Sequence, residues 1–211
     1  MSLLAERDDP GPVIKLPPPQ PKGRLSVEEA IAKRRSVRTY TAEPLTLVQV
    51  GQLVWAAQGM TGPRQSRAAP SAGATYPLEI LAAVGRETVG ALQAAVYHYE
   101  VSRHALTLHL LGDLREDLAR AALDQGFIAS APMDIVICTL YHRSTYRYGK
   151  RGERYVHMEA GHVAENVHLQ AVALGLAAVE VGAFDDEEVR NVLRLDEQIK
   201  PLYIMPVGKL R

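Results

Sequence analysis

The amino-acid sequence predicts an α+β fold. Helical signals and short β-type runs mix along the chain without the strict strand–helix–strand alternation of a doubly wound parallel sheet. The 211 residues, 47% hydrophobic and 23% charged, suffice for one compact domain with a sizeable core. We expect that domain over residues 25–211, after an extended arm over residues 1–24.

The arm is rich in proline, with six prolines between Pro10 and Pro21. This composition favours an extended segment of polyproline type over an independent folding unit. Val13, Ile14 and Leu16 would let the arm pack on a surface, such as that of a partner subunit. The alternative is a free tail.

Local signals place the elements of the domain in order. The capping box Ser26–Glu29 begins a short helix that ends near Arg34, and a second box at Thr46–Gln49 begins a helix over 47–58, which Gly59 ends. Residues 59–75 predict a long loop. The remaining patterns predict strands at 78–84, 95–101 and 105–111, a helix near 114–124, a strand at 134–141, a helix at 154–174, a strand at 176–181, a helix at 185–194 and a strand at 201–207.

The composition excludes some partners. Lys and Arg together number 24, as do Asp and Glu, whereas a general nucleic-acid binder usually carries a basic excess. No run reaches the roughly 18 apolar residues that span a bilayer, so we expect no membrane partner. The single cysteine, Cys138, lies in an apolar run, which favours a buried thiol, a reducing compartment and hence the cytoplasm.

Common catalytic and metal motifs are missing from the sequence. It has no Gly-x-Ser-x-Gly, no Walker motif, no Gly-x-Gly-x-x-Gly and no His-Glu-x-x-His. Two Glu-x-x-His pairs, Glu159/His162 and Glu165/His168, fall on the one helix predicted at 154–174. They point about 120° apart and cannot share an ion, so we expect no metal site.

Two basic clusters lie at opposite ends of the predicted domain. Arg34, Arg35 and Arg38 surround Ser36, and Lys209 and Arg211 end the chain. Guanidinium forks match phosphate oxygens, so these clusters predict a phosphate-bearing ligand held where the two ends meet. The alternatives are a solvated helix end, where cations are favourable anyway, and a frayed tail.

These clusters belong to a longer set of motifs that resembles the FMN-dependent nitroreductase superfamily. The set comprises Arg34-Arg35-Ser36-x-Arg38, the run Pro70–Pro77 (Pro-Ser-Ala-Gly-Ala-Thr-Tyr-Pro), Gly161-His162-x-x-x-Asn166, the turn Val181–Asp185 and the terminal Lys209-x-Arg211. It covers about residues 26–211. The segments 70–79 and 157–189 are most similar to the SagB-type dehydrogenases.

The resemblance implies an α+β sandwich, with a mixed β-sheet flanked by helices, that forms an intertwined homodimer with two FMN sites at its interface. Carried over to this chain, Arg34, Arg35, Ser36, Lys209 and Arg211 hold the FMN phosphate, and Arg38 lies near flavin N1 and the C2 carbonyl. Pro70, Ser71, Ala72 and Gly73 approach the same flavin from the partner subunit. The backbone of Val181, Gly182 and Ala183 faces flavin N5, with Gly182 at the reacting atom.

The function implied is that of an FMN-dependent oxidoreductase. It would transfer hydride between NAD(P)H or another donor and a small electrophilic acceptor by ping-pong chemistry. A SagB-type azoline dehydrogenase is one alternative, and a non-catalytic FMN-binding or storage protein is another. A phosphate-ligand module without flavin is the third.

One segment departs from the peptide-oxidising relatives. Those relatives show Lys-Tyr-Gly-x-Arg-Gly-x-Arg-Tyr, whereas this chain has Arg147-Tyr148-Gly149-Lys150-Arg151 at the same place. Tyr148 is kept and stands as a candidate catalytic residue, with a packed surface aromatic as its alternative role. Arg147 is a poor general base because the guanidinium pKa stays above about 12.

Overall fold

The computed structural model describes residues 12–63 and 66–211. Over these residues a seven-stranded sheet has the order β1-β4-β3-β2-β5-β7-β6. All ladders between the named strands are antiparallel, and parallel pairing occurs at isolated bridges such as Ser36–Ala178. The strands are β1 (Val13–Lys15), β2 (Leu78–Val84), β3 (Ala95–Glu100), β4 (Ala105–Leu111), β5 (Met133–Thr139), β6 (Leu176–Ala178) and β7 (Lys200–Lys209).

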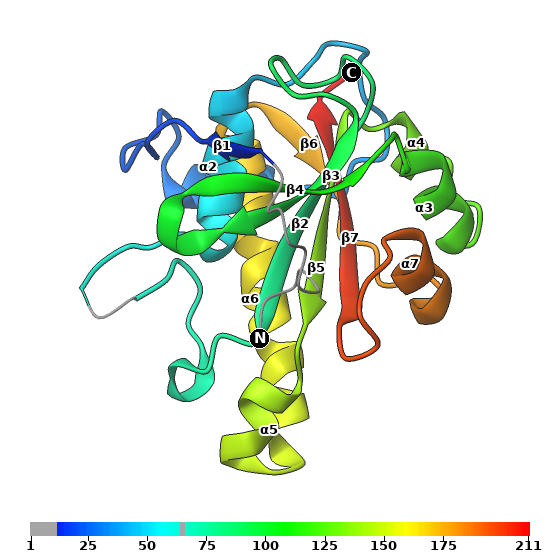
Figure 1. The fold of residues 1–211 in the computed structure, drawn as a ribbon. Helices are drawn as coiled ribbons and strands as arrows, with labels where there is room; N and C mark the ends of the chain where they lie inside the picture. The colour runs from blue at the N-terminus through cyan, green and yellow to red at the C-terminus, as the bar shows by residue number, and fades with distance from the viewer. Residues whose placement is uncertain (1–11, 64–65) are drawn as a thin grey trace.

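Helices cover both faces of the sheet (Figure 1). One face packs on α2 (Leu47–Gln58) and α6 (Arg151–Ala173), with α1 (Val27–Lys33) lying on α6. The other face packs on α3 (Arg115–Ala121), α4 (Phe127–Ser130) and α7 (Asp186–Val192). Alternate residues of β5 therefore enter different cores: Ile135 and Ile137 join the first, Val136 and Cys138 the second. All seven residues of β5 are buried, as a strand covered on both faces requires.

Helix α6 is the longest helix among the described residues and packs along one face of the sheet. Its 23 residues span about 34 Å at the usual helical rise. Figure 1 shows its N-terminal end, with α5 (His142–Tyr148), extending beyond the sheet. The helix gives way to β6 at Gly175, whose φ of 70° favours glycine.

The predicted elements are confirmed with small shifts at their ends. The helix at 47–58 and the strands at 78–84 and 105–111 have the predicted bounds. The strand predicted at 176–181 is divided: β6 ends at Ala178, and Val181 then pairs separately with Ile204. The sequence patterns did not predict β1, α4 or α5.

The described part of the proline-rich arm packs on its own chain. Strand β1 pairs with β4, and Leu16 is 5% exposed within the core. The Gln20 N–H donates to Gln52 Oε1 at 2.8 Å, which fixes the arm to α2. Residues 1–11 of the predicted arm lie outside the described residues.

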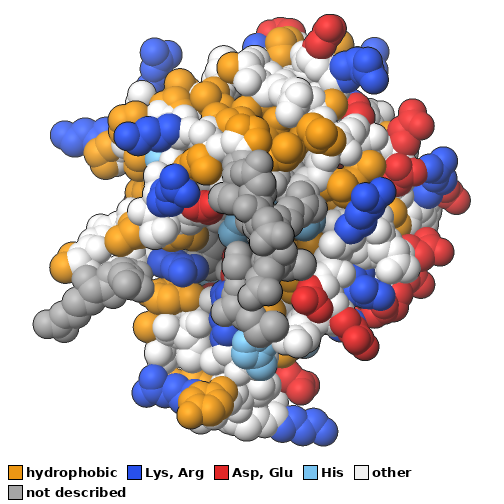
Figure 2. Space-filling model, in the orientation of Figure 1, with side chains coloured by type: hydrophobic (Ala, Val, Ile, Leu, Met, Phe, Trp, Pro, Cys, Tyr) orange, Lys and Arg blue, Asp and Glu red, His pale blue; other side chains and the backbone are white. Residues whose placement is uncertain are grey.

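Two further expectations can be compared with the structure. Cys138 is fully buried on β5, as predicted, and burial raises the pKa of its thiol. Among the described residues, no helix is both long and apolar enough to cross a membrane. Figure 2 shows acidic side chains gathered over the α3 and α7 side of the molecule.

Candidate active site

The two ends of the domain meet beside β6 and β7. Ser36 forms a bridge with Ala178, and the Val37 N–H donates to the Ala178 carbonyl at 3.0 Å. A few residues on, Tyr40 forms an antiparallel bridge with Leu210. The backbone that follows the Arg34–Arg38 cluster therefore lies against the strand end that carries Lys209 and Arg211. Convergence of the side chains on one phosphate stays a prediction.

The Arg34–Arg38 cluster begins directly at the end of α1. The Arg34 N–H closes the helix on the Ala30 carbonyl at 2.9 Å, and the chain then becomes extended. The Arg35 guanidinium folds back on the helix end, where Nη1 donates to the carbonyls of Ala32 at 3.0 Å and Arg34 at 2.6 Å. Arg35 thus occupies the helix-end role that the sequence left open. Arg34 is half-buried, and Ser36 is exposed.

Arg38 points to a different element from the other two arginines. Its guanidinium carbon lies 5.5 Å from the centroid of the Phe127 ring on α4, within range of a cation–π contact. Arg38 is exposed, so the ring orients the cation without burying it. The cluster therefore presents cations toward both β6 and α4.

The C-terminal cluster is held loosely. Lys209 Nζ lies 2.6 Å from Glu43 Oε2, and the two side chains are 32% and 65% exposed. An ion pair this exposed contributes at most about 1 kcal/mol, so Lys209 can exchange Glu43 for another anion at little cost. Arg211 is exposed at the end of the chain.

The turn at Val181–Ala183 lies at the edge of the same region. Val181 exchanges two backbone hydrogen bonds with Ile204, at 2.9 and 3.0 Å, and the Ala183 carbonyl accepts from Gln125 Nε2 at 2.8 Å. Gly182 is exposed, and a Cβ built on it would meet Tyr203 at an ordinary 3.6 Å. The packing of this chain alone would therefore admit an alanine at Gly182. The hydrogen bonds fix the turn, and its exposed backbone faces solvent.

The Pro70–Gly73 segment lies elsewhere, against α5. Ser71 Oγ accepts the Tyr76 N–H at 2.9 Å, and Arg147 Nη1 donates to the Gly73 carbonyl at 3.1 Å. Gly73 has a φ of 59°, and a Cβ on it would clash with the Tyr148 hydroxyl. Tyr148 itself is half-buried and packs edge-on against Tyr155, with ring centroids 5.2 Å apart. The structure therefore joins Tyr148 to the Pro70–Gly73 segment.

Within one chain, the Pro70–Gly73 segment and the basic clusters lie apart. Ser71 lies close enough to Glu159 of α6 to oppose the rise in the pKa of that carboxyl, whereas the Arg35 carbonyl hydrogen-bonds His168 of the same helix. Residues 159 and 168 are nine positions apart, which is about 13.5 Å along the helix axis. The two halves of the predicted site thus lie at different levels of α6.

A buried polar cluster supports the Pro70–Gly73 segment. Glu159 is 3% exposed, and burial raises the pKa of its carboxyl against the opposing effects of Ser71, Gln58 and Arg67. The Arg67 guanidinium stacks 4.2 Å from the centroid of the Tyr76 ring. Glu159 appeared in the sequence only as half of a metal motif, and no local signal predicts this placement.

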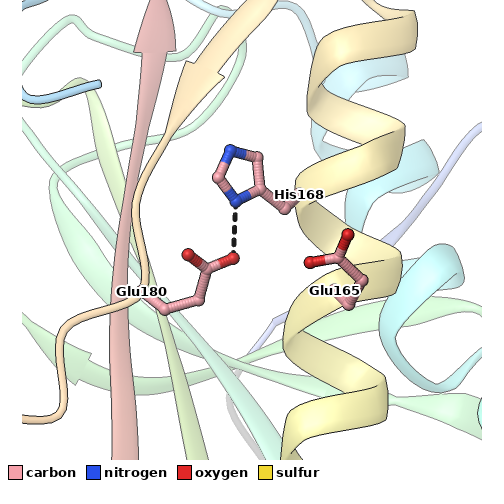
Figure 3. A group of neighbouring side chains, drawn as sticks. All are labelled: Glu165, His168 and Glu180. Carbon is pink, nitrogen blue, oxygen red and sulfur yellow. Dashed lines mark hydrogen bonds and ion pairs between the residues drawn. The ribbon is translucent and has the colours of Figure 1, made fainter. Parts of the chain in front are cut away.

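A second polar cluster lies between α6 and the segment after β6 (Figure 3). His168 is fully buried, with Nδ1 2.6 Å from Glu180 Oε1 and Nε2 3.1 Å from the Arg35 carbonyl oxygen. Glu165, His168 and Glu180 each offer one atom within 4.8 Å of the others. Helical spacing in the sequence revealed only Glu165 and His168, which both lie on α6. It missed Glu180, which lies on the segment after β6. The expectation of no metal site stays a prediction.

Comparison with known proteins identifies the family to which this fold belongs. Residues 31–209 match the model of the nitroreductase family. The chain belongs to the nitroreductase family. This membership and the fold confirm the resemblance predicted from the sequence, and the chain is accordingly a nitroreductase-family oxidoreductase.

Individual relatives agree with the family assignment. A candidate nitroreductase of Methanocaldococcus jannaschii is 49% identical over 185 residues, covering 88% of this chain and 91% of the relative. A candidate nitroreductase of Ralstonia eutropha JMP134, known from its crystal structure, superposes with a TM-score of 0.82 at 27% identity, over 96% of this chain and 93% of that one. The trifolitoxin-processing protein TfxB of Rhizobium leguminosarum bv. trifolii is 32% identical over 66% of this chain, which spans 38% of TfxB.

Proposed function

We propose that this nitroreductase-family protein is an FMN-dependent oxidoreductase that acts as a homodimer. The observation that carries the proposal is that the backbone segments bearing the two basic clusters lie side by side, held by the Ser36–Ala178 and Tyr40–Leu210 bridges. Nitroreductase-family proteins generally bind FMN, whose phosphate carries up to about two negative charges at neutral pH. Cations from both ends of the domain, together with the exposed Ser36, suit that group.

The residues near this meeting point fit the different parts of FMN. Arg34, Ser36, Lys209 and Arg211 would hold the phosphate through charge-assisted hydrogen bonds, with Arg35 fixing the helix end beneath them. Arg38, on the α4 side, would lie near N1 and the C2 carbonyl and stabilise negative charge there. The open turn of Val181, Gly182 and Ala183 would let its backbone approach N5 closely.

When bound, FMN would supply the redox chemistry, passing hydride from NAD(P)H or another donor to a small electrophilic acceptor in a ping-pong cycle. The chain contributes binding and orientation. The Gly182 backbone would fix the reacting edge of the ring, and Arg38 would raise the reduction potential by favouring the anionic reduced form. No protein nucleophile is required.

The homodimer follows from the family resemblance and is compatible with the positions of the two segments along α6. The Pro70–Gly73 segment lies about 13.5 Å along the helix from the level of Arg35, and a partner subunit would supply it to the same flavin. A groove of about 600 Å³, lined by residues of α1, α2 and α6 that include Trp55 and Leu169, offers an apolar surface for that partner. Val27 and Ile31 of α1 are 66% and 56% exposed beside it.

Azoline oxidation is the second candidate, favoured by Tyr148 and by the similarity to the trifolitoxin-processing protein TfxB. Tyr148 lies at Gly73, the segment proposed to approach the flavin. Arg147, however, stands where the peptide-oxidising relatives have lysine, and its guanidinium is engaged by the Gly73 carbonyl. A proton acceptor other than Arg147 would be needed for this reaction.

The phosphate role is tested by Arg34→Ala combined with Lys209→Ala. Hydrogen bonds to charged groups contribute about 1.5–3 kcal/mol each, so losing two should weaken FMN binding by several kcal/mol. Lys15→Ala with Arg103→Ala removes the same charge at the opposite edge of the sheet and should leave FMN binding unchanged. FMN retained through dialysis by the first double variant would refute the phosphate role.

The reaction is tested by an anaerobic screen of donors and acceptors. Reduction of the bound flavin by NADH or NADPH, followed by reoxidation with a nitroaromatic or quinone, would support the proposed oxidoreductase. Oxidation of a thiazoline peptide would support the second candidate instead. Tight FMN binding with no turnover by any pair would point to a flavin-storage protein.

A further inference from the structure

His168 is a buried histidine with both ring nitrogens engaged. It projects from the apolar face of α6 beside Ala164, Val167 and Ala171 and is 0% exposed. Nε2 faces the backbone carbonyl oxygen of Arg35 at 3.1 Å, and Nδ1 faces Glu180 Oε1 at 2.6 Å. Figure 3 shows the imidazole between the helix and the strand segment that carries Glu180.

The two contacts fix the orientation of the ring. A carbonyl oxygen only accepts hydrogen bonds, so Nε2 carries a proton and donates it to the Arg35 carbonyl. On the other side of the ring, Nδ1 lies within hydrogen-bond distance of Glu180 Oε1. Both ring nitrogens are therefore engaged, and the imidazole cannot turn without breaking a buried hydrogen bond.

The two hydrogen bonds link three elements of the fold. Glu180 comes from the segment after β6, His168 from α6 and Arg35 from the end of α1. Each ring nitrogen has a partner, which is the condition under which a buried polar side chain is tolerated.

The His168 side chain joins the proposed phosphate-binding turn to the segment that leads to Gly182. The Arg35 carbonyl belongs to the turn between Arg34 and Ser36, and Glu180 precedes Gly182 by two residues. We propose that His168 is a positioning residue, whose two hydrogen bonds fix the phosphate-binding turn against the strand segment that leads to Gly182. Since His168 has no exposed surface, it acts through Arg35 and Glu180 and does not touch a ligand. The inference rests on the function proposed above.

The same three acidic and imidazole side chains could also form a metal site. A metal ion on Nδ1 would displace the 2.6 Å hydrogen bond to Glu180. The positioning role and a metal site therefore make opposite demands on Nδ1. Binding of Zn²⁺ at one per chain in the wild-type protein, abolished by Glu165→Gln, would overturn the proposal.

The test compares FMN with riboflavin, which has the same ring system and no phosphate. Two variants of His168 serve as a matched pair, because a glutamine amide nitrogen reaches the position of Nε2 and an asparagine amide nitrogen that of Nδ1. His168→Gln should keep the bond to Arg35, and His168→Asn should keep the bond to Glu180. Dissociation constants for both ligands are measured by flavin fluorescence at neutral pH, with urea unfolding to compare stability.

The proposal expects His168→Asn to weaken FMN binding by about 10-fold or more, because the buried Arg35 carbonyl loses its hydrogen bond, with riboflavin binding within about 2-fold of wild type. His168→Gln should retain most of the preference for FMN. Equal FMN-to-riboflavin ratios in wild type and His168→Asn would overturn the positioning role while leaving the proposed function intact. Failure of the wild-type protein to bind any flavin would overturn both.

Discussion

Asp134 allows a quantitative test of the core beneath the candidate site. It lies on β5 between Ala83 of β2 and Pro206 of β7, and it is 0% exposed. Neither carboxyl oxygen has a hydrogen-bond partner among the residues that the structure describes. Burial raises the pKa of Asp134 well above its ordinary value of 3.8, and Arg115 opposes this only in part. The folded protein therefore holds Asp134 as a neutral acid.

The sign of the pH effect on the free energy of unfolding depends on whether the folded or the unfolded chain keeps the Asp134 proton. Above about pH 3.8 the unfolded chain releases the Asp134 proton while the folded chain keeps it, so the folded state binds more protons. This group then lowers the free energy of unfolding by about 1.4 kcal/mol for each pH unit up to its folded pKa. Asp134→Asn has nearly the same shape and does not titrate. As pH rises, the free energy of unfolding of the variant should therefore exceed that of wild type by about 1.4 kcal/mol more for each pH unit.

The assay is urea unfolding of wild type and Asp134→Asn at several pH values between 4 and 7, extrapolated to zero denaturant. Other titrating groups contribute to both curves, so the difference between them isolates Asp134. Asp124→Asn, at an exposed position, is the matched control and should track wild type throughout. A constant difference between wild type and Asp134→Asn across this range would refute the neutral buried acid.

Three further changes probe the site and its surroundings. Gly73→Ala should lower the free energy of unfolding by at least about 1–2 kcal/mol, because φ is 59° and the new Cβ would clash with the Tyr148 hydroxyl; wild-type stability in urea would contradict this. Glu180 has a lowered pKa, so its contribution is present above pH 4.5 and is lost as pH falls through the folded value. Glu180→Gln should therefore lose less stability than wild type in acid, and parallel acid unfolding curves would argue against it. Ile31→Lys, at an exposed position beside the groove, should yield a folded monomer without bound flavin, as judged by light scattering; a flavin-loaded monomer would refute the shared site.

Elements with local signals were predictable from the sequence. The Thr46 side chain accepts from the Gln49 N–H, and the Gln49 side chain accepts from the Thr46 N–H, so α2 begins where the capping box predicted. Gly59 then ends the helix at the predicted position. The Arg34–Arg38 cluster was likewise visible because it is contiguous in the chain.

Elements that depend on distant contacts were not predictable. Helix α5 has no apolar periodicity and is fixed by tertiary bonds: the Ser144 hydroxyl lies 2.8 Å from that of Thr75, and Arg143 donates to the Tyr76 carbonyl at 3.1 Å. Strand β1 forms within a proline-rich stretch because β4 offers it a free edge. The partnership of His168 with Glu180 depends on the packing of α6 against the segment after β6, which helical spacing alone does not reveal.

The two segments proposed to contact the flavin lie at different levels of α6. Glu159, beside Ser71, and His168, beside the Arg35 turn, lie nine residues apart on one helix, so neither segment can approach the other by a local loop movement. In the dimer proposed above, the Pro70–Gly73 segment of one chain would lie at the basic cluster of the other. The proposed anion-binding residues, by contrast, all come from one chain, where the Tyr40–Leu210 bridge holds its two end segments together. A monomer should therefore retain weak affinity for inorganic phosphate even where it has lost the flavin ring.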